Sequence, residues 1–429
     1  TPDEHRLHRR LFLKGVAASG AAAVTSFTGL FTVPAFAAAA KRAEKRVILL
    51  WLCGAPSQFE TWDPKPGRPS GGPFGSIPTA LPGVHFSSLM PRCATIADRL
   101  NVVRCMRTKQ TEHLQAINLL TRGNPDRAGF TRPTLGAAVS AALGAVDTKL
   151  PNFILLDPNP RGNEFEAYKA SDLAGWVGPE HAPVRLGGEF TQLGRSADAL
   201  AGDKDDRLAL RRYFAKRYET ERTSRTAAAQ NAAFEKMNGL TASADLFDIA
   251  KLPEKDRGRY GPGTFGLHAL MARNLVEHGA PFVMVANGMP WDNHVFQHEI
   301  HQMLVPELDR VLHCLVTDLH DRGLLDHTLV VAMGEFGRTP WLNAARGRDH
   351  YPDAWSLMMT GCGLKRGVVV GGTDPDGVDP AGKSFNEQNL FATIFTALGI
   401  DPYAEYDLPG FPTFHRVEDR AEPIREVLA

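Results

Sequence analysis

Short, uninterrupted apolar segments recur along this chain, and turn-forming residues separate them. Segments of this length that are rich in Val, Ile and Leu are typical of strands buried on both faces of a sheet. Strands are predicted at residues 46–52, 101–105, 152–156, 281–286, 328–333, 355–360 and 367–370. The first of them is apolar throughout after its basic first residue, so we expect it to lie in the centre of the sheet.

Between these strands, the apolar positions follow a helical period. Helices are predicted at residues 111–120, 265–278, 300–319 and 385–398. Thr111 is placed as the N-cap of the first of these helices, and Gly279 ends the second. Alternating helices and strands are typical of a parallel sheet that is covered on both faces. The expected fold class is therefore α/β.

The first residues of the chain have the pattern of an export signal. Arg9 and Arg10 form a twin-arginine motif ahead of an apolar, alanine-rich stretch, residues 16–36, which ends in a small-residue cleavage signal. A membrane anchor is the alternative, but polar residues and a late proline interrupt the stretch. Residues 1–37 are predicted to be a twin-arginine signal peptide. This implies the periplasm or cell envelope and no permanent membrane span after cleavage.

The remaining residues, 38–429, are expected to form one large α/β domain. Residues 147–200 are interrupted by Pro and Gly, so they are predicted to be a loop insertion with one short strand. Residues 205–260 are predicted to be a helical segment, whose charged first part is expected to be solvated helix packed on the body.

The charge balance and the cysteines exclude several classes of protein. The chain has 48 basic and 48 acidic residues, so no net field attracts nucleic acid or an anionic membrane surface. Its five cysteines include no Cys-x-x-Cys pair, which excludes a structural zinc site and a disulfide framework. Cys53, Cys314 and Cys362 lie in apolar segments and are expected to be buried. The Gly371-Gly372 turn is not a phosphate-binding loop, because no Gly-Lys-Ser/Thr follows it.

Polar side chains follow several predicted strands directly. Asp292 and His294 come after the fourth strand, Glu335 follows the fifth, and His350 stands beside Asp349 before the sixth. Ligands of open α/β sheets bind beyond the carboxyl ends of strands, and nitrogen and oxygen ligands together suit zinc or manganese. The sequence therefore predicts Asp292, His294, Glu335 and His350 as metal ligands. The alternative is a helix-capping aspartate, exposed histidines and surface ion pairs.

Other side chains in the same segments extend this hypothesis. Arg338 and Arg348 are predicted to bind a phosphate or sulfate through paired hydrogen bonds, with a buried salt bridge as the alternative. Thr111 and Ser57 are candidate nucleophiles or anion-binding hydroxyls, although capping and turn hydroxyls are far commoner. His113 opens the helix beside the same crevice and is a further candidate ligand. A lone histidine in a helix is more often packed or exposed.

Several sequence blocks together resemble a known bacterial family. They are LWLCGAPSQFETWDPKP, HLQAINLLTRGNP, RYGPGTFGLHALMARNLVEHGAPFVMV, WDNH, GEFGRTP, GRDHYP, and GGTDPDG followed by FATIFTALGID. From about Val47 to the C terminus, the chain resembles the exported proteins named domain of unknown function 1501, which are placed in the alkaline phosphatase and sulfatase superfamily.

This resemblance implies an alkaline-phosphatase-like fold, a three-layer α/β/α sandwich with a mostly parallel sheet. It also implies hydrolysis of phosphate or sulfate esters with a divalent metal, namely zinc, manganese or calcium. By position, Asp292 and His294 resemble the superfamily's metal-binding loop, and His350 resembles its late metal-binding histidine. Thr111 lies near the position of the superfamily's nucleophile.

The chain also departs from the superfamily pattern. Glu335-Phe336 stands where an Asp-His pair is usual, and the chain has no Cys-x-Pro-x-Arg motif from which sulfatases form formylglycine. The loop after the first strand offers only Ser57, Glu60 and Asp63.

The predicted function is a metal-dependent hydrolase of small-molecule or polysaccharide esters in the cell envelope. One alternative is a non-catalytic protein that keeps the fold and binds a sulfated or phosphorylated polymer. The other is an accessory protein that assembles with exported partners, for which an uninterrupted apolar surface would be the sign.

Overall fold

The structure is a computed structural model. It describes residues 44–124, 131–143, 150–157, 173–187, 239, 243–287, 290–406 and 413–429. The predicted signal peptide lies outside the described residues, as do much of the predicted insertion and the charged first part of the predicted helical segment. By its contacts the chain divides into Thr1–Lys41 and Arg42–Ala429, and all the described residues belong to the second unit.

The second unit is built on one eight-stranded sheet with the order β12-β4-β11-β8-β1-β7-β5-β6. Its strands are β1 (Arg46–Trp51), β4 (Asn101–Met106), β5 (Phe153–Asp157), β6 (Val184–Gly187), β7 (Phe282–Ala286), β8 (Thr328–Met333), β11 (Trp355–Thr360) and β12 (Val369–Val370). β11 runs antiparallel to both of its neighbours, and all the other pairs are parallel. The sheet is therefore mostly parallel, as predicted.

β1 lies in the centre of the sheet, paired with β7 on one side and with β8 on the other. Its apolar side chains alternate between two separate cores, because successive residues of a strand point to opposite faces. Ile48 and Leu50 belong to one core, and Leu49 and Trp51 to the other. This explains why the sequence of β1 is apolar without interruption.

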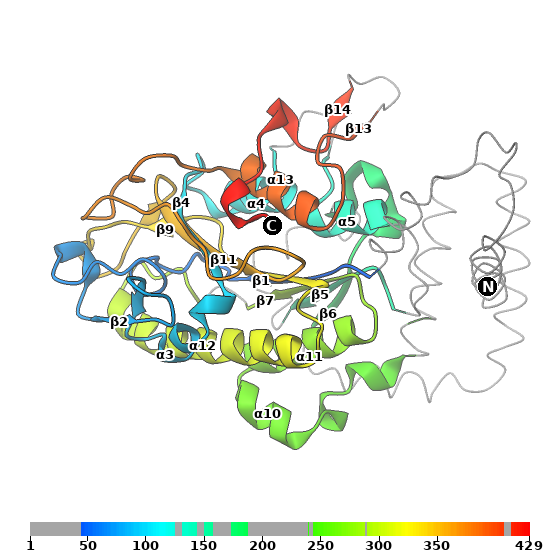
Figure 1. Cartoon of the computed structure of the whole chain (residues 1–429), viewed down its shortest axis with the longest axis horizontal. Helices are drawn as coiled ribbons and strands as arrows, with labels where there is room; N and C mark the ends of the chain where they lie inside the picture. The colour runs from blue at the N-terminus through cyan, green and yellow to red at the C-terminus, as the bar shows by residue number, and fades with distance from the viewer. Residues whose placement is uncertain are drawn as a thin grey trace, which may run out of the picture. The chain divides into compact units, whose positions relative to one another are not determined.

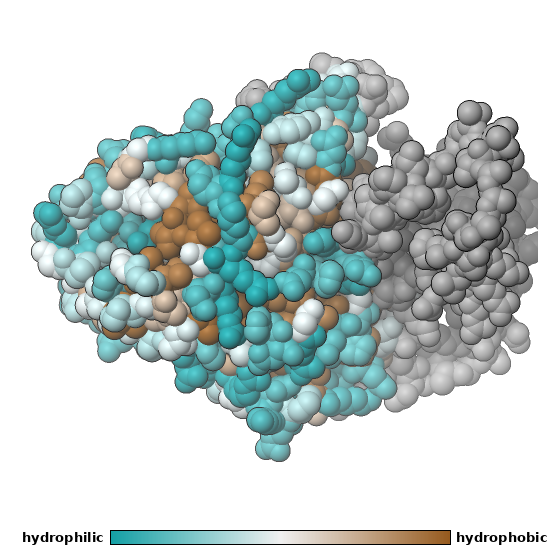
Figure 2. All heavy atoms as spheres, viewed as in Figure 1, coloured by the Kyte–Doolittle hydropathy of each residue, from teal (hydrophilic) through white to brown (hydrophobic). Residues whose placement is uncertain are grey.

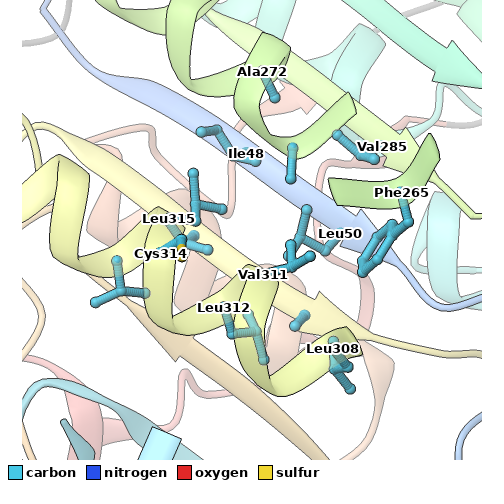
Figure 3. Close-up of a cluster of buried hydrophobic side chains, with 14 of the residues drawn as sticks. Ile48, Leu50, Phe265, Ala272, Val285, Leu308, Val311, Leu312, Cys314 and Leu315 are labelled. Atoms are coloured by element: carbon cyan, nitrogen blue, oxygen red, sulfur yellow. The ribbon is translucent and has the colours of Figure 1, made fainter. Parts of the chain in front are cut away.

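Helices cover both faces of the sheet (Figure 1). The face of Ile48 and Leu50 is covered by α11 (Thr264–Glu277) and α12 (Gln297–Asp321), whose apolar side chains meet those of β1 and β7 in Figure 3. The opposite face is covered by α4 (His113–Arg122), α5 (Leu135–Leu143) and α13 (Glu387–Ala397). The architecture is thus an α/β/α sandwich, which confirms the predicted fold class.

Smaller elements complete the unit. They are α3 (Pro91–Thr95), α10 (Glu254–Tyr260) and the short strands β2 (Ser76–Pro78), β3 (His85–Ser87), β9 (Gly337–Arg338), β10 (His350–Tyr351), β13 (Glu405–Tyr406) and β14 (Phe414–His415). Short 3-10 helices lie at Pro69–Gly71, Ala97–Arg99, Gly175–Val177, Pro179–His181, Ala244–Phe247, Ile249–Lys251, Glu418–Arg420 and Arg425–Val427. In the described part of the chain, no helix combines the length and apolar character needed to cross a membrane. The face shown in Figure 2 is mostly hydrophilic, with hydrophobic residues gathered in patches.

All seven predicted strands and four predicted helices are present, with ends that differ by a few residues. Among the strands of the central sheet and the helices that cover it, two elements were not predicted. The first is α5, whose small residues give little contrast between apolar and polar positions along the helix. The second is β6, which pairs with β5 at the edge of the sheet. The N-cap prediction was wrong: α4 begins at His113, its N-cap is Glu112, and no side chain caps it. All five cysteines are buried.

Candidate metal site at the carboxyl edge of the sheet

The candidate ligands meet at one edge of the sheet because of its topology. β4, β7 and β8 run in the same direction, so the loops after them emerge together, and antiparallel β11 begins at that same edge. His113 follows β4, Asp292 and His294 follow β7, Glu335 follows β8, and His350 precedes β11. All five predicted ligands are thus brought into one place.

Three imidazoles surround a single carboxylate oxygen. The Nε2 atoms of His113, His294 and His350 lie 3.3, 3.0 and 3.2 Å from Asp292 Oδ1. The Nε2 atoms of His294 and His350 are 3.0 Å apart. The ligand atoms of His113, Asp292 and His350 all lie within 4.8 Å of one another, a spacing that one metal ion can bridge. We call these four side chains the His/Asp cluster.

Each imidazole of the cluster has its other nitrogen turned outward to an oxygen acceptor. His113 Nδ1 lies 2.8 Å from Glu335 Oε1, and His294 Nδ1 lies 2.8 Å from Asp349 Oδ1. His350 Nδ1 lies 2.5 Å from the backbone oxygen of Thr111. Since carboxylates and carbonyls only accept, each Nδ1 must donate its hydrogen. In the neutral imidazoles the Nε2 lone pairs then point toward the centre of the cluster, as in metal-ligating histidines.

Asp292 carries the negative charge of the cluster. Burial opposes its ionisation, but hydrogen bonds from His113 and His350, when these imidazoles also carry a proton on Nε2, and from Arg338 hold the pKa of Asp292 well below its usual range. Arg338 Nη2 donates to Asp292 Oδ1 over 2.8 Å. One carboxylate oxygen has two lone pairs, so it cannot satisfy three imidazoles and a guanidinium together. A cation held between these atoms would satisfy all the inward lone pairs.

The donor set fits some metals better than others. Three imidazole nitrogens and a carboxylate oxygen match the ligands of zinc, and imidazole also suits other transition metals. Calcium takes six to eight oxygen ligands, which this cluster does not offer. Of the three metals expected from the sequence, zinc and manganese therefore fit and calcium does not.

Glu335 stands behind the cluster rather than in it. Its Oε1 accepts hydrogen bonds from His113 Nδ1 and, over 2.8 Å, from the backbone N–H of Gly54. A side chain at Gly54 would place its Cβ 2.4 Å from the backbone nitrogen of Asp292, so the close approach requires glycine. Phe336 packs its ring against His113 and His350, with centroid distances of 5.1 and 4.5 Å. Glu335 therefore orients His113, which corrects its predicted role as a ligand.

The predicted anion clamp also needs correction, because both arginines are fully buried. Arg338 donates to the backbone oxygens of Ala55, Gly54 and Arg348 besides Asp292. Arg348 donates to the backbone oxygens of Thr339 and Ser70 and to Glu60. Neither guanidinium lies where a dissolved phosphate or sulfate can reach it. The two side chains join the loops that carry the site.

The two candidate hydroxyl residues lie in different settings. Ser57 is buried, its backbone N–H donates to His301 Nε2 over 3.2 Å, and its Oγ accepts from the N–H of Phe59. In this setting Ser57 is shielded from solvent, and its anion-binding role stays a prediction. Thr111 is exposed, and it contributes its backbone oxygen to His350. Its role as a nucleophile stays a prediction.

Two supporting residues were not assigned from the sequence. Asp349 orients His294. Its position next to His350 in the sequence could have indicated a role in the site. Asn343 donates from Nδ2 to Asp349 Oδ1 and to the backbone oxygen of His294, both over 3.0 Å, and no sequence pattern pointed to it. Gly347 lets the two loops touch, since a Cβ there would lie 1.9 Å from the carbonyl carbon of His294.

A second, mostly buried polar network lies under these loops. Glu60 Oε1 lies 3.0 Å from Arg348 Nη2 and 3.5 Å from His298 Nε2. Burial opposes the ionisation of Glu60, but Arg348 and His298 hold its pKa well below the usual range. Burial lowers the pKa of His301 to about 4, although the charge of Glu60 opposes this. His301 is therefore neutral in the folded protein near neutral pH.

This network predicts acid sensitivity. The depressed pKa of His301 means that the unfolded chain takes up a proton first as the pH falls below about 6.5. The folded state therefore keeps its full free energy of unfolding above about pH 6.5. It loses on the order of 2–3 kcal/mol of it as the pH falls toward 4. Urea unfolding of His301→Gln between pH 7.5 and 4.5 should show a weaker pH dependence than the wild type, whereas exposed His327→Gln should show the same one. If the stability of His301→Gln depended on pH as strongly as that of the wild type, His301 would not be the group responsible. The pH dependence that remains in His301→Gln belongs partly to His268, because burial lowers the pKa of His268 to about 4 as well.

Comparison with known proteins gives one family. The sequence model of the family described as "Protein of unknown function (DUF1501)" matches residues 44–428. A search of curated proteins finds no match.

Solved structures that resemble this chain do so at low identity. The lipoteichoic acid synthase LtaP from Listeria monocytogenes has 11% identity and a TM-score of 0.36, over 83% of this chain and 72% of that one. The PsFucS1 sulfatase from Pseudoalteromonas sp. has 13% identity and a TM-score of 0.39, over 86% and 72%. The alkaline phosphatase from the Antarctic bacterium TAB5 has 13% identity and a TM-score of 0.33, over 78% and 95%. At these TM-scores the likenesses carry no argument about activity.

Proposed function

The chain belongs to the DUF1501 family, as its sequence predicted, and we propose that it is a metal-dependent hydrolase of phosphate or sulfate esters. In this proposal His113, Asp292, His294 and His350 hold one divalent transition metal, with zinc or manganese favoured by the donor set. The predicted signal peptide places the protein in the cell envelope, where small-molecule or polysaccharide esters would be its substrates and other exported proteins its partners.

One observation carries the proposal. Three imidazoles have their Nδ1 atoms fixed by outer acceptors, and their Nε2 atoms all face the oxygen of Asp292. If no cation is bound and the imidazoles are neutral, the lone pairs of the three Nε2 atoms and of Asp292 Oδ1 face one another across 3.0–3.3 Å and repel. A purely structural cluster would need positively charged imidazoles side by side, whereas metal binding satisfies the inward lone pairs of neutral imidazoles.

The site suits hydrolysis because of what each residue does there. A divalent cation would polarise an ester and lower the pKa of bound water. Asp349, Glu335 and the Thr111 carbonyl keep the imidazoles oriented, and Arg338 keeps Asp292 ionised. His294 leaves the cluster open to solvent, since its side chain is 42% exposed. An anionic ester has access from that side.

A second candidate function is a non-catalytic protein that binds metal and an anionic ligand. One observation favours it: the three candidate side chains of the loop after β1 have their described contacts away from the cluster. Ser57 and Glu60 are turned into the buried network, and Asp63 pairs with Lys65 and Thr373. That loop therefore provides neither a nucleophile nor a further ligand.

Metal binding and turnover, measured separately, test both functions. Zinc, manganese and calcium are titrated into chelator-treated protein by calorimetry, and hydrolysis of 4-nitrophenyl phosphate and 4-nitrophenyl sulfate is then assayed. We expect zinc or manganese to bind at one ion per chain, calcium to bind weakly, and at least one ester to be hydrolysed. Metal binding without turnover on esters of either class would favour the non-catalytic function. No binding of any metal would exclude both.

Removing the outer partner of His294 should weaken the site without destroying it. In Asp349→Asn the carboxylate no longer fixes the His294 tautomer, so we expect zinc affinity to fall about 10–100-fold, the usual effect of losing an outer-shell partner. Calorimetric titration of both proteins checks this. Exposed Asp353, four residues away, provides the matched Asp353→Asn control. Equal zinc affinity in Asp349→Asn and the wild type would remove Asp349 from the site.

A further inference from the structure

Exposed large apolar side chains are concentrated beside the His/Asp cluster. Across the described residues they range from 40% to 69% exposed, and they are Leu114, Val295, Phe296, Met303, Trp341 and Leu342. Leu114 follows ligand His113 in sequence, and Val295 and Phe296 follow His294. Trp341 and Leu342 lie in the loop between Arg338 and Asp349. Single exposed apolar residues are ordinary, but a group around a polar site indicates a binding surface.

Four of these residues belong to two loops that form one connected unit. Val295 pairs with Arg346 in an isolated bridge, and the backbone N–H of Phe296 donates to Ala345 over 3.3 Å. The ring of Trp341 meets that of Tyr351 edge to face, with centroids 5.9 Å apart. Since Tyr351 follows His350, the aromatic surface is tied to a ligand-bearing segment. We call Val295, Phe296, Trp341 and Leu342 the apolar rim.

We propose that the apolar rim binds the alcohol part of the ester substrate, and that this part is an extended alkyl or aryl group. The inference rests on the proposed function, in which the anionic part of the ester lies at the His/Asp cluster. Because the rim residues adjoin the ligands in sequence and in the fold, a molecule that reaches the cluster from solvent lies beside them. Covering apolar surface then contributes affinity that the anionic group alone does not provide.

The charges of the same loops argue against a highly charged polymer as the occupant. The loop between Arg338 and His350 contains two cations, of which Arg348 is buried and Arg346 pairs with Glu299. Asp349 adds a half-exposed carboxylate beside the rim. A polymer with many sulfate or phosphate groups would find one anion site and no row of free cations in this loop.

The size of the rim argues against a second copy of the chain. A stable protein interface uses roughly 20–30 residues on each side. The four side chains of the apolar rim are too few for such an interface, but they match the apolar part of a small ligand.

Alkylphosphonates test the proposal without requiring turnover, because their carbon–phosphorus bond is not hydrolysed. Methylphosphonate and hexylphosphonate are titrated into zinc-loaded protein by calorimetry. Each methylene covered by protein increases affinity about fourfold, so we expect hexylphosphonate to bind at least ~10-fold more tightly. Equal binding of the two would overturn the apolar rim and leave the proposed function standing. Binding of neither would overturn both.

Variants of the apolar rim show whether it causes the difference in affinity between hexylphosphonate and methylphosphonate. In Trp341→Ala and Phe296→Ser, the dissociation constant of methylphosphonate divided by that of hexylphosphonate should fall at least ~3-fold, since a contact between the alkyl chain and an aromatic ring is lost. Both ligands are measured on the same variant, so a loss of correctly folded protein does not change the ratio. Met303→Ser is the control, because Met303 is exposed on α12 outside both loops. An unchanged ratio in both rim variants would overturn the proposal, and so would a dimer that Trp341→Ala converts to monomers.

Discussion

Replacing His350 by alanine should abolish both ester hydrolysis and tight zinc binding while the protein stays folded. His350 contributes one of three inward Nε2 atoms, at 3.2 Å from Asp292 Oδ1 and 3.0 Å from His294 Nε2. A metal left with fewer protein ligands should bind more weakly by more than the ~10–100-fold expected for an outer partner. The fold should survive because β10 has two residues and lies outside the central sheet.

The matched control is His327→Ala, which makes the same change at an exposed histidine just before β8. It lies at the amino end of that strand, whereas the cluster lies beyond the carboxyl ends. Zinc titration, ester hydrolysis and circular dichroism are compared for the two variants. If His350→Ala binds zinc as tightly as the control does, the His/Asp cluster is not the metal site.

The positions of the candidate ligands could be predicted because they depend on the order and direction of the strands. Once apolar runs identify parallel strands, the polar residues that follow those strands must emerge at the same edge. Asp292 and His294 satisfied this condition. His350 reaches the same edge because it precedes antiparallel β11, and the structure places the three residues within a few ångströms of one another. His113 was the least expected member, since nothing local distinguishes it from a packed helical histidine.

The roles of the other residues could not be predicted, because they depend on how loops distant in sequence pack together. Glu335 turns toward His113 because the Gly54 N–H meets it from a loop 281 residues away in sequence. Arg338 and Arg348 have the chemistry of an anion clamp, and only their complete burial shows that they bind backbone oxygens. A sequence pattern gives the type of a side chain, but not the direction in which it points.

Arg338→Met should cause the largest loss of stability among these variants. The guanidinium is fully buried, donates to three backbone oxygens and pairs with Asp292 over 2.8 Å. Methionine fills similar space but donates nothing, so these acceptors lose their partners. Breaking a buried pair from one side costs about 3–5 kcal/mol. The free energy of unfolding in urea, measured on metal-free protein, checks this value.

Arg346→Met is the control, because Arg346 is exposed and its pair with Glu299 lies at the surface. It should change stability by less than about 1 kcal/mol. An equally small change in Arg338→Met would contradict the account of a buried, fully engaged guanidinium.

A double-mutant cycle with Asp292→Asn then separates the two kinds of partner that Arg338 has. If the charge pair dominates, the double variant should lose less stability than the sum of the single variants, with a coupling of about 0.5–3 kcal/mol. If the backbone oxygens of Gly54, Ala55 and Arg348 dominate, the two losses should add. Coupling would mean that Arg338 sets the charge of Asp292, and additivity would mean that it mainly joins the loops.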